Sequence, residues 1–168
     1  GCWMIALGIE SGSNKILEKA QKNATVEQAI KSVKILDELD IKVYGYFIIG
    51  LLGETKETIR KTIDLAKSLP ITFAIFHVAS PFPGTEFYKT VKKEGWLTYT
   101  DWEAADQGEN SPIDYPDLSG EEIMSGIKRA YREFYLRPEA ICRIITSVKN
   151  PKDIYHLLSA GVSQLLWK

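Results

Sequence analysis

The hydrophobic positions of the first hundred residues form three short apolar runs separated by longer amphipathic stretches. The runs cover residues 3–9, 42–49 and 71–79, and they are almost wholly apolar. That length and near-continuous hydrophobicity are typical of strands buried on both faces of a parallel sheet. The short connections between strand and helix then favour a β-α-β-α-β order with parallel strands.

Between the apolar runs, hydrophobic residues recur at spacings of three and four, as on the buried side of a helix. Thr25 and Gln28 match a capping box, in which each side chain satisfies a free backbone amide at the helix start. Thr55 is a second N-cap candidate, and Pro70 ends the helix that follows it. Helices are therefore predicted over residues 13–20, 25–39 and 55–69.

The pattern changes after residue 95, and residues 96–118 are turn-rich with no clear period. Ser119 and Glu122 form another capping box, which opens a helix that Pro138 ends. Asn150 precedes a proline, and this pair predicts the start of a further helix.

Composition places the chain among ordinary globular proteins. It has 168 residues, is 45% hydrophobic and 26% charged, and its formal net charge is −1. This excludes disorder for most of the chain and argues against nucleic acid as a partner. No apolar run reaches the roughly 18 residues of a membrane span, and the N-terminus lacks the basic region of a signal peptide. We expect an α/β part over residues 1–97 and a loop-rich, helical extension over residues 98–168.

The cysteines and histidines are too few and too scattered for a metal site. Cys2 and Cys142 lie at opposite ends of the chain, and the two histidines are His77 and His156. A secreted disulfide framework would show more cysteines, so reduced thiols in a cytoplasmic protein are the expectation. No metal ligand is predicted within this chain.

Three irregular segments follow the predicted strands, at the end of an α/β sheet where ligands bind. They are residues 8–13, 50–55 and 80–85, and they combine small residues with the carboxylates of Glu10 and Glu54. Small residues let a ligand approach the backbone, and a carboxylate accepts hydrogen bonds from hydroxyl or ammonium groups. A structural alternative stays open for each segment, as a tight glycine turn, a carboxylate at a helix start, or a proline-stiffened turn.

These segments resemble the radical S-adenosylmethionine (SAM) enzymes. The resemblance rests on Gly-Ile-Glu-Ser-Gly-Ser at residues 8–13, on residues 48–55, and on Ser-Pro-Phe-Pro-Gly-Thr at residues 80–85. More narrowly, the chain is similar to the cobalamin-binding group that includes the anaerobic magnesium-protoporphyrin monomethyl ester oxidative cyclase. Residues 131–138 extend that similarity beyond the segment where it is strongest, residues 4–95.

The resemblance implies a fold, cofactors and binding residues. The fold would be the C-terminal half of a radical SAM (β/α) barrel, a partial barrel, with a helical extension. The cofactors would be S-adenosylmethionine, a [4Fe–4S] cluster on three closely spaced cysteines, and cobalamin in an upstream module. By analogy, the residues that contact S-adenosylmethionine are Glu10, Ser11, Ile48, Gly50, Glu54, Ala79 and Ser80. Leu51 and Leu52 depart from the family pattern, in which an aromatic residue and a proline are common.

The cluster motif Cys-x3-Cys-x2-Cys is absent from these 168 residues. The chain therefore looks like a fragment that begins near the fourth of six barrel strands and is inactive alone. Its expected partners are the N-terminal half of its own chain and a small-molecule substrate such as a tetrapyrrole. The exposed edge and inner face of the half-sheet are expected either to bind a second copy or to be covered by the chain's own C-terminal helices. The competing interpretations are a non-catalytic half-barrel that serves as a scaffold or binds nucleotides, and another (β/α) barrel enzyme.

Several aromatic residues have two interpretations. His77, on a predicted strand, is either a core histidine or a contact to substrate or cofactor. Four loop aromatics either line a flat substrate pocket or cover the fold: Trp96, Tyr99, Trp102 and Tyr115. Helical spacing assigns Tyr131, Phe134 and Tyr135 to the core.

Overall fold

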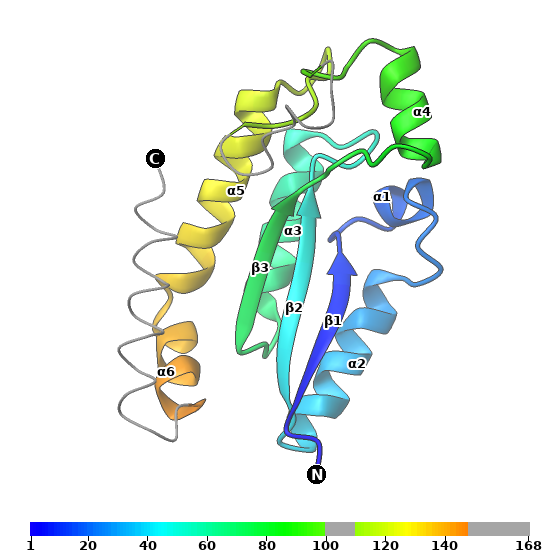
Figure 1. The fold of residues 1–168 in the computed structure, drawn as a ribbon. Helices are drawn as coiled ribbons and strands as arrows, with labels where there is room; N and C mark the ends of the chain where they lie inside the picture. The colour runs from blue at the N-terminus through cyan, green and yellow to red at the C-terminus, as the bar shows by residue number, and fades with distance from the viewer. Residues whose placement is uncertain (100–109, 148–168) are drawn as a thin grey trace.

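The computed structural model describes residues 1–99 and 110–147, and its centre is a sheet of three parallel strands. Strand β1 (Met4–Glu10) pairs with β2 (Lys42–Ile49), and β2 pairs with β3 (Phe73–Val78). The spatial order follows the chain order, so each strand lies beside the next (Figure 1). The predicted parallel β-α-β-α-β unit is confirmed. It is an open sheet of three strands in the described part, and a closed barrel is not formed.

The helices begin and end close to where the capping signals place them. They are α1 (Asn14–Lys19), α2 (Val26–Glu38), α3 (Lys56–Ser68), α4 (Glu86–Lys93), α5 (Gly120–Tyr135) and α6 (Pro138–Ser147). Capping boxes start α2, α3 and α5, with Thr25, Thr55 and Ser119 as the N-caps. Pro138 follows the end of α5, as predicted, and is also the first residue of α6. A proline is tolerated there because the first amides of a helix have no partner within the helix. The helix predicted from Asn150 lies outside the described residues.

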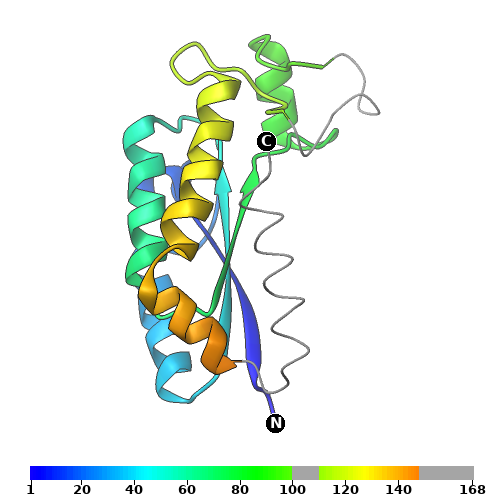
Figure 2. The ribbon, with the colours of Figure 1, turned by 90° about the vertical axis from the view of Figure 1, so that its left-hand side faces the viewer.

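One face of the sheet carries the core. In β2, alternate residues are buried, and Phe47 and Ile49 are fully enclosed. Helices α2, α3 and α5 pack on this face, and Figure 2 shows α3 and α5 on the same side of the sheet. They contribute Val33, Ile63 and Phe134 to the core, and each of these three side chains is fully buried.

The expectation that the strands are buried on both faces is wrong for the described chain. In β1, Ala6 and Gly8 are exposed, and Ile9 is the one buried residue. In β2, residues 42, 44, 46 and 48 are only half-buried. The physical reason is that the three packed helices all cover the same face. The opposite face of the sheet is referred to below as the open face.

The outer edge of β3 is covered by two tyrosines of α5. The Tyr131 hydroxyl accepts from the Phe76 amide at 3.2 Å and donates to the Phe76 carbonyl at 3.3 Å. The Tyr135 hydroxyl does the same at Ala74, at 3.2 and 2.9 Å. Edge strands invite pairing with other chains through such groups, so α5 protects this edge. Self-association through an exposed sheet edge stays a prediction.

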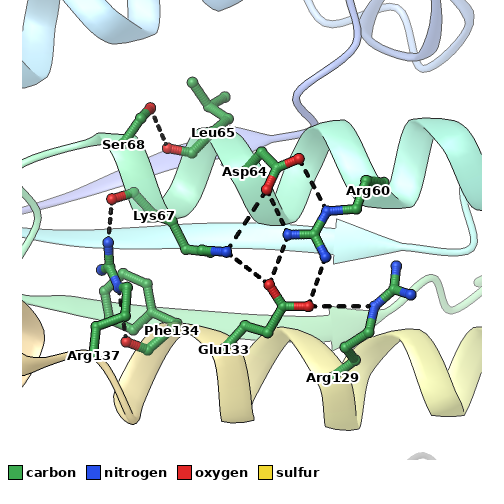
Figure 3. A network of polar contacts seen from close by, with 9 residues as sticks. All are labelled: Arg60, Asp64, Leu65, Lys67, Ser68, Arg129, Glu133, Phe134 and Arg137. Carbon is green, nitrogen blue, oxygen red and sulfur yellow. Dashed lines mark hydrogen bonds and ion pairs between the residues drawn. The ribbon is translucent and has the colours of Figure 1, made fainter.

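A charged network joins α5 to α3 (Figure 3). Arg60 donates to both oxygens of Glu133 at 2.6 Å, and Lys67 reaches the same carboxylate at 2.8 Å. These charge-assisted bonds hold the pKa of Glu133 well down, at about 2. Arg137, at the end of α5, donates to the Lys67 carbonyl. Residues of α5 also share one hydrophobic core with α3 and the sheet. The division of the chain at residue 97 stays a prediction.

No helix in the described residues is both long and apolar enough to cross a membrane.

Candidate functional site

A pocket of about 940 Å³ lies where the carboxyl ends of the three strands meet α1 and α4. Figure 1 shows both helices beyond the strand tips. Four of the predicted binding residues line this pocket: Glu10, Ile48, Ala79 and Ser80. The other three, Ser11, Gly50 and Glu54, lie just behind its wall. The volume is near the upper end of the roughly 300–1,000 Å³ of small-molecule sites.

Glu10 is held at the pocket by an unusual backbone conformation. Its φ is 64°, in the left-handed region that is uncommon for residues other than glycine. The carboxylate folds back over Gly8, where an added Cβ atom would lie only 2.4 Å from Glu10 Oε1. Lys22 donates to the same oxygen at 2.9 Å, and the Glu10 side chain stays 20% exposed. Among the described residues, Lys22 is the hydrogen-bond donor to this carboxylate, and it uses one of the two oxygens.

Ile48, Ala79 and Ser80 form the opposite wall. Ile48 is half-buried on the open face of β2, and Ala79 is buried at the end of β3. The Ala79 amide donates to the Ile49 carbonyl at 2.8 Å, which continues the sheet one residue beyond β3. The Ser80 hydroxyl donates to the Val78 carbonyl at 3.4 Å. This wall offers an apolar side chain beside irregular backbone, a combination that suits a flat ring with a polar edge.

Glu54 organises the turn after β2. It is 4% exposed, and its Oε2 accepts from the amides of Gly50 at 2.7 Å and Leu51 at 3.3 Å. Thr58 donates to the other oxygen at 3.3 Å. Burial raises the pKa of Glu54 to about 7, and the three donors only partly oppose this effect. Glu54 thus shapes the backbone behind the pocket.

Tyr115, from the segment before α5, holds the other side of Gly50. Its hydroxyl donates to the Gly50 carbonyl at 2.9 Å, and burial raises its pKa. Gly50 has a φ of 97°, which a side-chain-bearing residue rarely adopts. Both backbone polar groups of this glycine are therefore bonded to side chains, one from its own turn and one from the segment before α5.

Ser11 also faces away from the pocket. It is fully buried, and its hydroxyl shares a hydrogen bond of 3.2 Å with Thr62 of α3. The next amide, of Gly12, donates to the same Thr62 oxygen at 2.9 Å. A Cβ at Gly12 would lie 2.4 Å from the Lys61 carbonyl oxygen. The small residues after β1 therefore allow close packing of this loop on α3.

The three loop aromatics that the structure describes, Trp96, Tyr99 and Tyr115, take the covering role and do not line the pocket. Trp96 and Tyr115 pack edge to face at 5.3 Å beside a small apolar cluster that contains Val91 and Ile113. The Tyr99 hydroxyl donates to the Pro81 carbonyl at 3.1 Å. Trp102 lies outside the described residues.

Sequence reasoning missed residues that also line the pocket, including Tyr46 of β2 and Lys19 of α1. It left His77 open, and the expectation of a core histidine is wrong because His77 is exposed on the pocket wall. The alternation of side chains between the two faces of β2 could have identified Tyr46 as a pocket residue. Once Phe47 and Ile49 are assigned to the core, Tyr46 and Ile48 must face the other way.

Known proteins are similar to this chain over the segments that form the pocket. The family model described as the radical SAM superfamily matches residues 1–66, which include β1, β2 and most of α3. An uncharacterized methyltransferase of Pyrococcus horikoshii is 34% identical over 149 residues, 86% of this chain and 31% of that protein. Bacteriochlorophyllide d C-12(1)-methyltransferase of Chlorobaculum tepidum is 27% identical over 136 residues, 80% of this chain and 29% of its own length.

A third relative is the anaerobic magnesium-protoporphyrin IX monomethyl ester cyclase of Cereibacter sphaeroides. It is 28% identical over 135 residues, 79% of this chain and 21% of the cyclase. The chain thus spans between about a fifth and a third of the length of these relatives. The matched segment holds Glu10, the Glu54 turn and the α3 residues that support them, and these similarities together place the chain in the radical SAM superfamily.

Proposed function

We propose that this chain supplies S-adenosylmethionine-binding strands to a radical SAM enzyme. The observation that carries the proposal is the convergence of Glu10, Ile48, Ala79 and Ser80 on one pocket at the carboxyl ends of parallel strands. These four residues come from all three strands or the turns that follow them. Ligands of α/β sheets bind at this end of the strands.

The residues present fit the cofactor. The Glu10 carboxylate has one oxygen that Lys22 does not use, and it is placed to accept from ribose hydroxyls. Ile48 offers an apolar contact for adenine, and the backbone at Ala79 and Ser80 lies beside its polar edge. When bound beside a reduced cluster, S-adenosylmethionine supplies a 5′-deoxyadenosyl radical. The residues of this chain bind and orient the cofactor, with Gly50 held rigidly by Glu54 and Tyr115.

The [4Fe–4S] cluster that the superfamily uses needs ligands from outside this chain. The sequence holds two cysteines, at positions 2 and 142, and both side chains are exposed. Within residues 1–99 and 110–147, no group of three or more His, Cys, Asp or Glu side chains could hold a metal ion. Cobalamin, if the enzyme uses it, would also be bound by another part.

For the reaction, we propose methyl transfer to a tetrapyrrole. The relatives named above include two methyltransferases, and one of them is named for a bacteriochlorophyllide. Oxidative ring formation is the second candidate, because the third relative is named as a cyclase of a magnesium porphyrin ester. Both candidates place a large planar substrate beside the cofactor pocket.

The test uses the full-length enzyme, purified without oxygen. About four irons and four sulfides per chain are expected, with cobalt if cobalamin is used. Label from the methyl group of S-adenosylmethionine should appear in the product of a methyltransferase and not in that of a cyclase. No iron after reconstitution would favour the scaffold or nucleotide-binding alternative.

The role of Glu10 is tested separately from the chemistry. Glu10→Ala should weaken S-adenosylmethionine binding about 10- to 100-fold, as expected for losing a hydrogen bond to a charged group. Glu38→Ala is the control, because Glu38 is an exposed residue on α2 and does not line the pocket. Equal affinity of the Glu10 variant and the control would refute the assigned contact.

A further inference from the structure

The open face of the sheet carries a continuous row of aromatic rings. We call Phe73, Tyr44, Tyr46 and His77 the aromatic row. Neighbouring ring centroids are 4.7 Å apart for Phe73 and Tyr44, 6.2 Å for Tyr44 and Tyr46, and 6.0 Å for Tyr46 and His77. The ring planes of these neighbours lie within 29° of each other, and those of Tyr46 and His77 within 2°.

Sheet geometry explains the row. Tyr44 pairs in register with Phe73, and Ile48 pairs with His77 on the neighbouring strand. Residues two apart on a strand share a face, so Tyr44, Tyr46 and Ile48 all point away from the helices. The row consequently leads out of the cofactor pocket, which Tyr46 and His77 line, toward the amino ends of β2 and β3.

The row is accessible where it meets the pocket. His77 is exposed, Tyr46 and Tyr44 are half-buried, and Phe73 alone is buried, at 8% exposure. Tyr46 and His77 line the same pocket of about 940 Å³ as four of the predicted cofactor-binding residues, so the row and those residues share one cavity.

The chemistry of the row selects a particular class of ligand. The four rings stack on one another, so they present their edges along the open face. A flat aromatic ligand that lies on this face would meet these edges, and edge-to-face contacts between aromatic rings are favourable. A multi-ring system can reach the three rings that are not buried, those of Tyr44, Tyr46 and His77. Ala6 and Ile75 share this face beside the row, and Lys42 lies on it at the amino end of β2. The three strands carry a single Lys or Arg side chain, Lys42, whereas a polyanionic nucleic acid would require several.

We propose that the aromatic row is the binding surface for the substrate's conjugated ring system, with Tyr46 and His77 as specificity-determining residues. The proposal rests on the function proposed above and names the part of the site that receives the tetrapyrrole. The ring lies along the open face, and the edge nearest Tyr46 and His77 is presented to the cofactor pocket. Glu10, Ile48, Ala79 and Ser80 remain the cofactor's side of the same cavity.

The test is binding of zinc protoporphyrin IX to the purified enzyme, followed by its absorbance and fluorescence. Tyr46→Leu and His77→Leu keep apolar bulk but remove the rings. Each should raise the dissociation constant about three- to tenfold, as expected for losing one aromatic contact. Trp3→Leu is the matched control, because Trp3 is 65% exposed and lies outside the pocket.

The outcomes separate this proposal from the one on which it rests. Equal affinity of the row variants and the Trp3 control, or equal loss in all three, would overturn the row as a specific site. Loss of S-adenosylhomocysteine binding in the row variants, with porphyrin binding unchanged, would also overturn it, since the row would then serve the cofactor. If Glu10→Ala leaves S-adenosylhomocysteine binding unchanged while the row variants lose porphyrin, the cofactor assignment fails and the row stands. Circular dichroism confirms that each variant is folded.

Discussion

Replacing Glu54 by glutamine should abolish a pH dependence of stability that the buried carboxyl creates. Glu54 is 4% exposed, and burial raises its pKa from 4.5 to about 7. In the unfolded chain the carboxyl titrates near its ordinary value. Between about pH 4.5 and 7 the native state therefore binds more protons than the unfolded state. The free energy of unfolding must fall as the pH rises through this window and level off above it.

The magnitude follows from the size of the shift. A displacement of about 2.5 pKa units corresponds to about 3 kcal/mol, at about 1.4 kcal/mol per unit. The glutamine side chain of the variant keeps a neutral carbonyl that can accept from the Gly50 and Leu51 amides, and it cannot ionise. From pH 4.5 to pH 8, the wild type should therefore lose about 3 kcal/mol of unfolding free energy relative to the Glu54→Gln variant.

The assay is urea unfolding of both proteins at a series of pH values, with the difference taken at each pH. Taking the difference removes contributions from groups that titrate alike in both proteins, including Glu133. A difference that stays constant across the window would refute the claim that burial dominates over the three hydrogen bonds of Glu54.

Two further predictions concern the contacts of the C-terminal segment. Glu133→Gln should lower the unfolding free energy by about 1 kcal/mol at pH 7, because the network is partly exposed and solvent screens it. The pKa of Glu133 is depressed to about 2, so its contribution exists above about pH 4.5 and is lost toward pH 2; an equal deficit at pH 2.5 and pH 7 would contradict this. Tyr115→Phe removes the bond to the Gly50 carbonyl and should cost about 1 kcal/mol in urea unfolding. Tyr135→Phe is the control, because it removes bonds to Ala74 near the amino end of β3, away from the pocket, and only the Tyr115 variant should also weaken S-adenosylmethionine binding.

The elements were predictable because their signals are local. The predicted strand over residues 42–49 coincides with β2. The capping boxes at Thr25 and Ser119 depend on residues three apart, and both form. Pro70 ends α3 because the residue before a proline prefers extended backbone, and Leu69 has a ψ of 142°.

The site was only partly predictable because its contacts are not local. Glu10 and Ser11 are neighbours at the end of β1, yet Ser11 bonds to Thr62, 51 residues away, and Glu10 turns into the pocket. What separates them is the left-handed backbone of Glu10, which no spacing rule reveals. The burial of the strands was misjudged for a related reason, because an apolar run does not tell how many of its faces a helix will cover.

The two edges of the sheet are not equivalent, and this bears on how the chain fits into a larger barrel. At the β3 edge, Tyr131 and Tyr135 occupy the backbone amide and carbonyl groups of Ala74 and Phe76. A strand added there would have to displace α5 and break the ionic network of Glu133 with α3. No described helix donates or accepts in this way along β1. We therefore propose that any further strand of a barrel would join at β1. At β3, the described sheet ends against α5. Because Tyr115, just before α5, also holds the Gly50 turn, this segment both covers the β3 edge and supports the backbone behind the pocket.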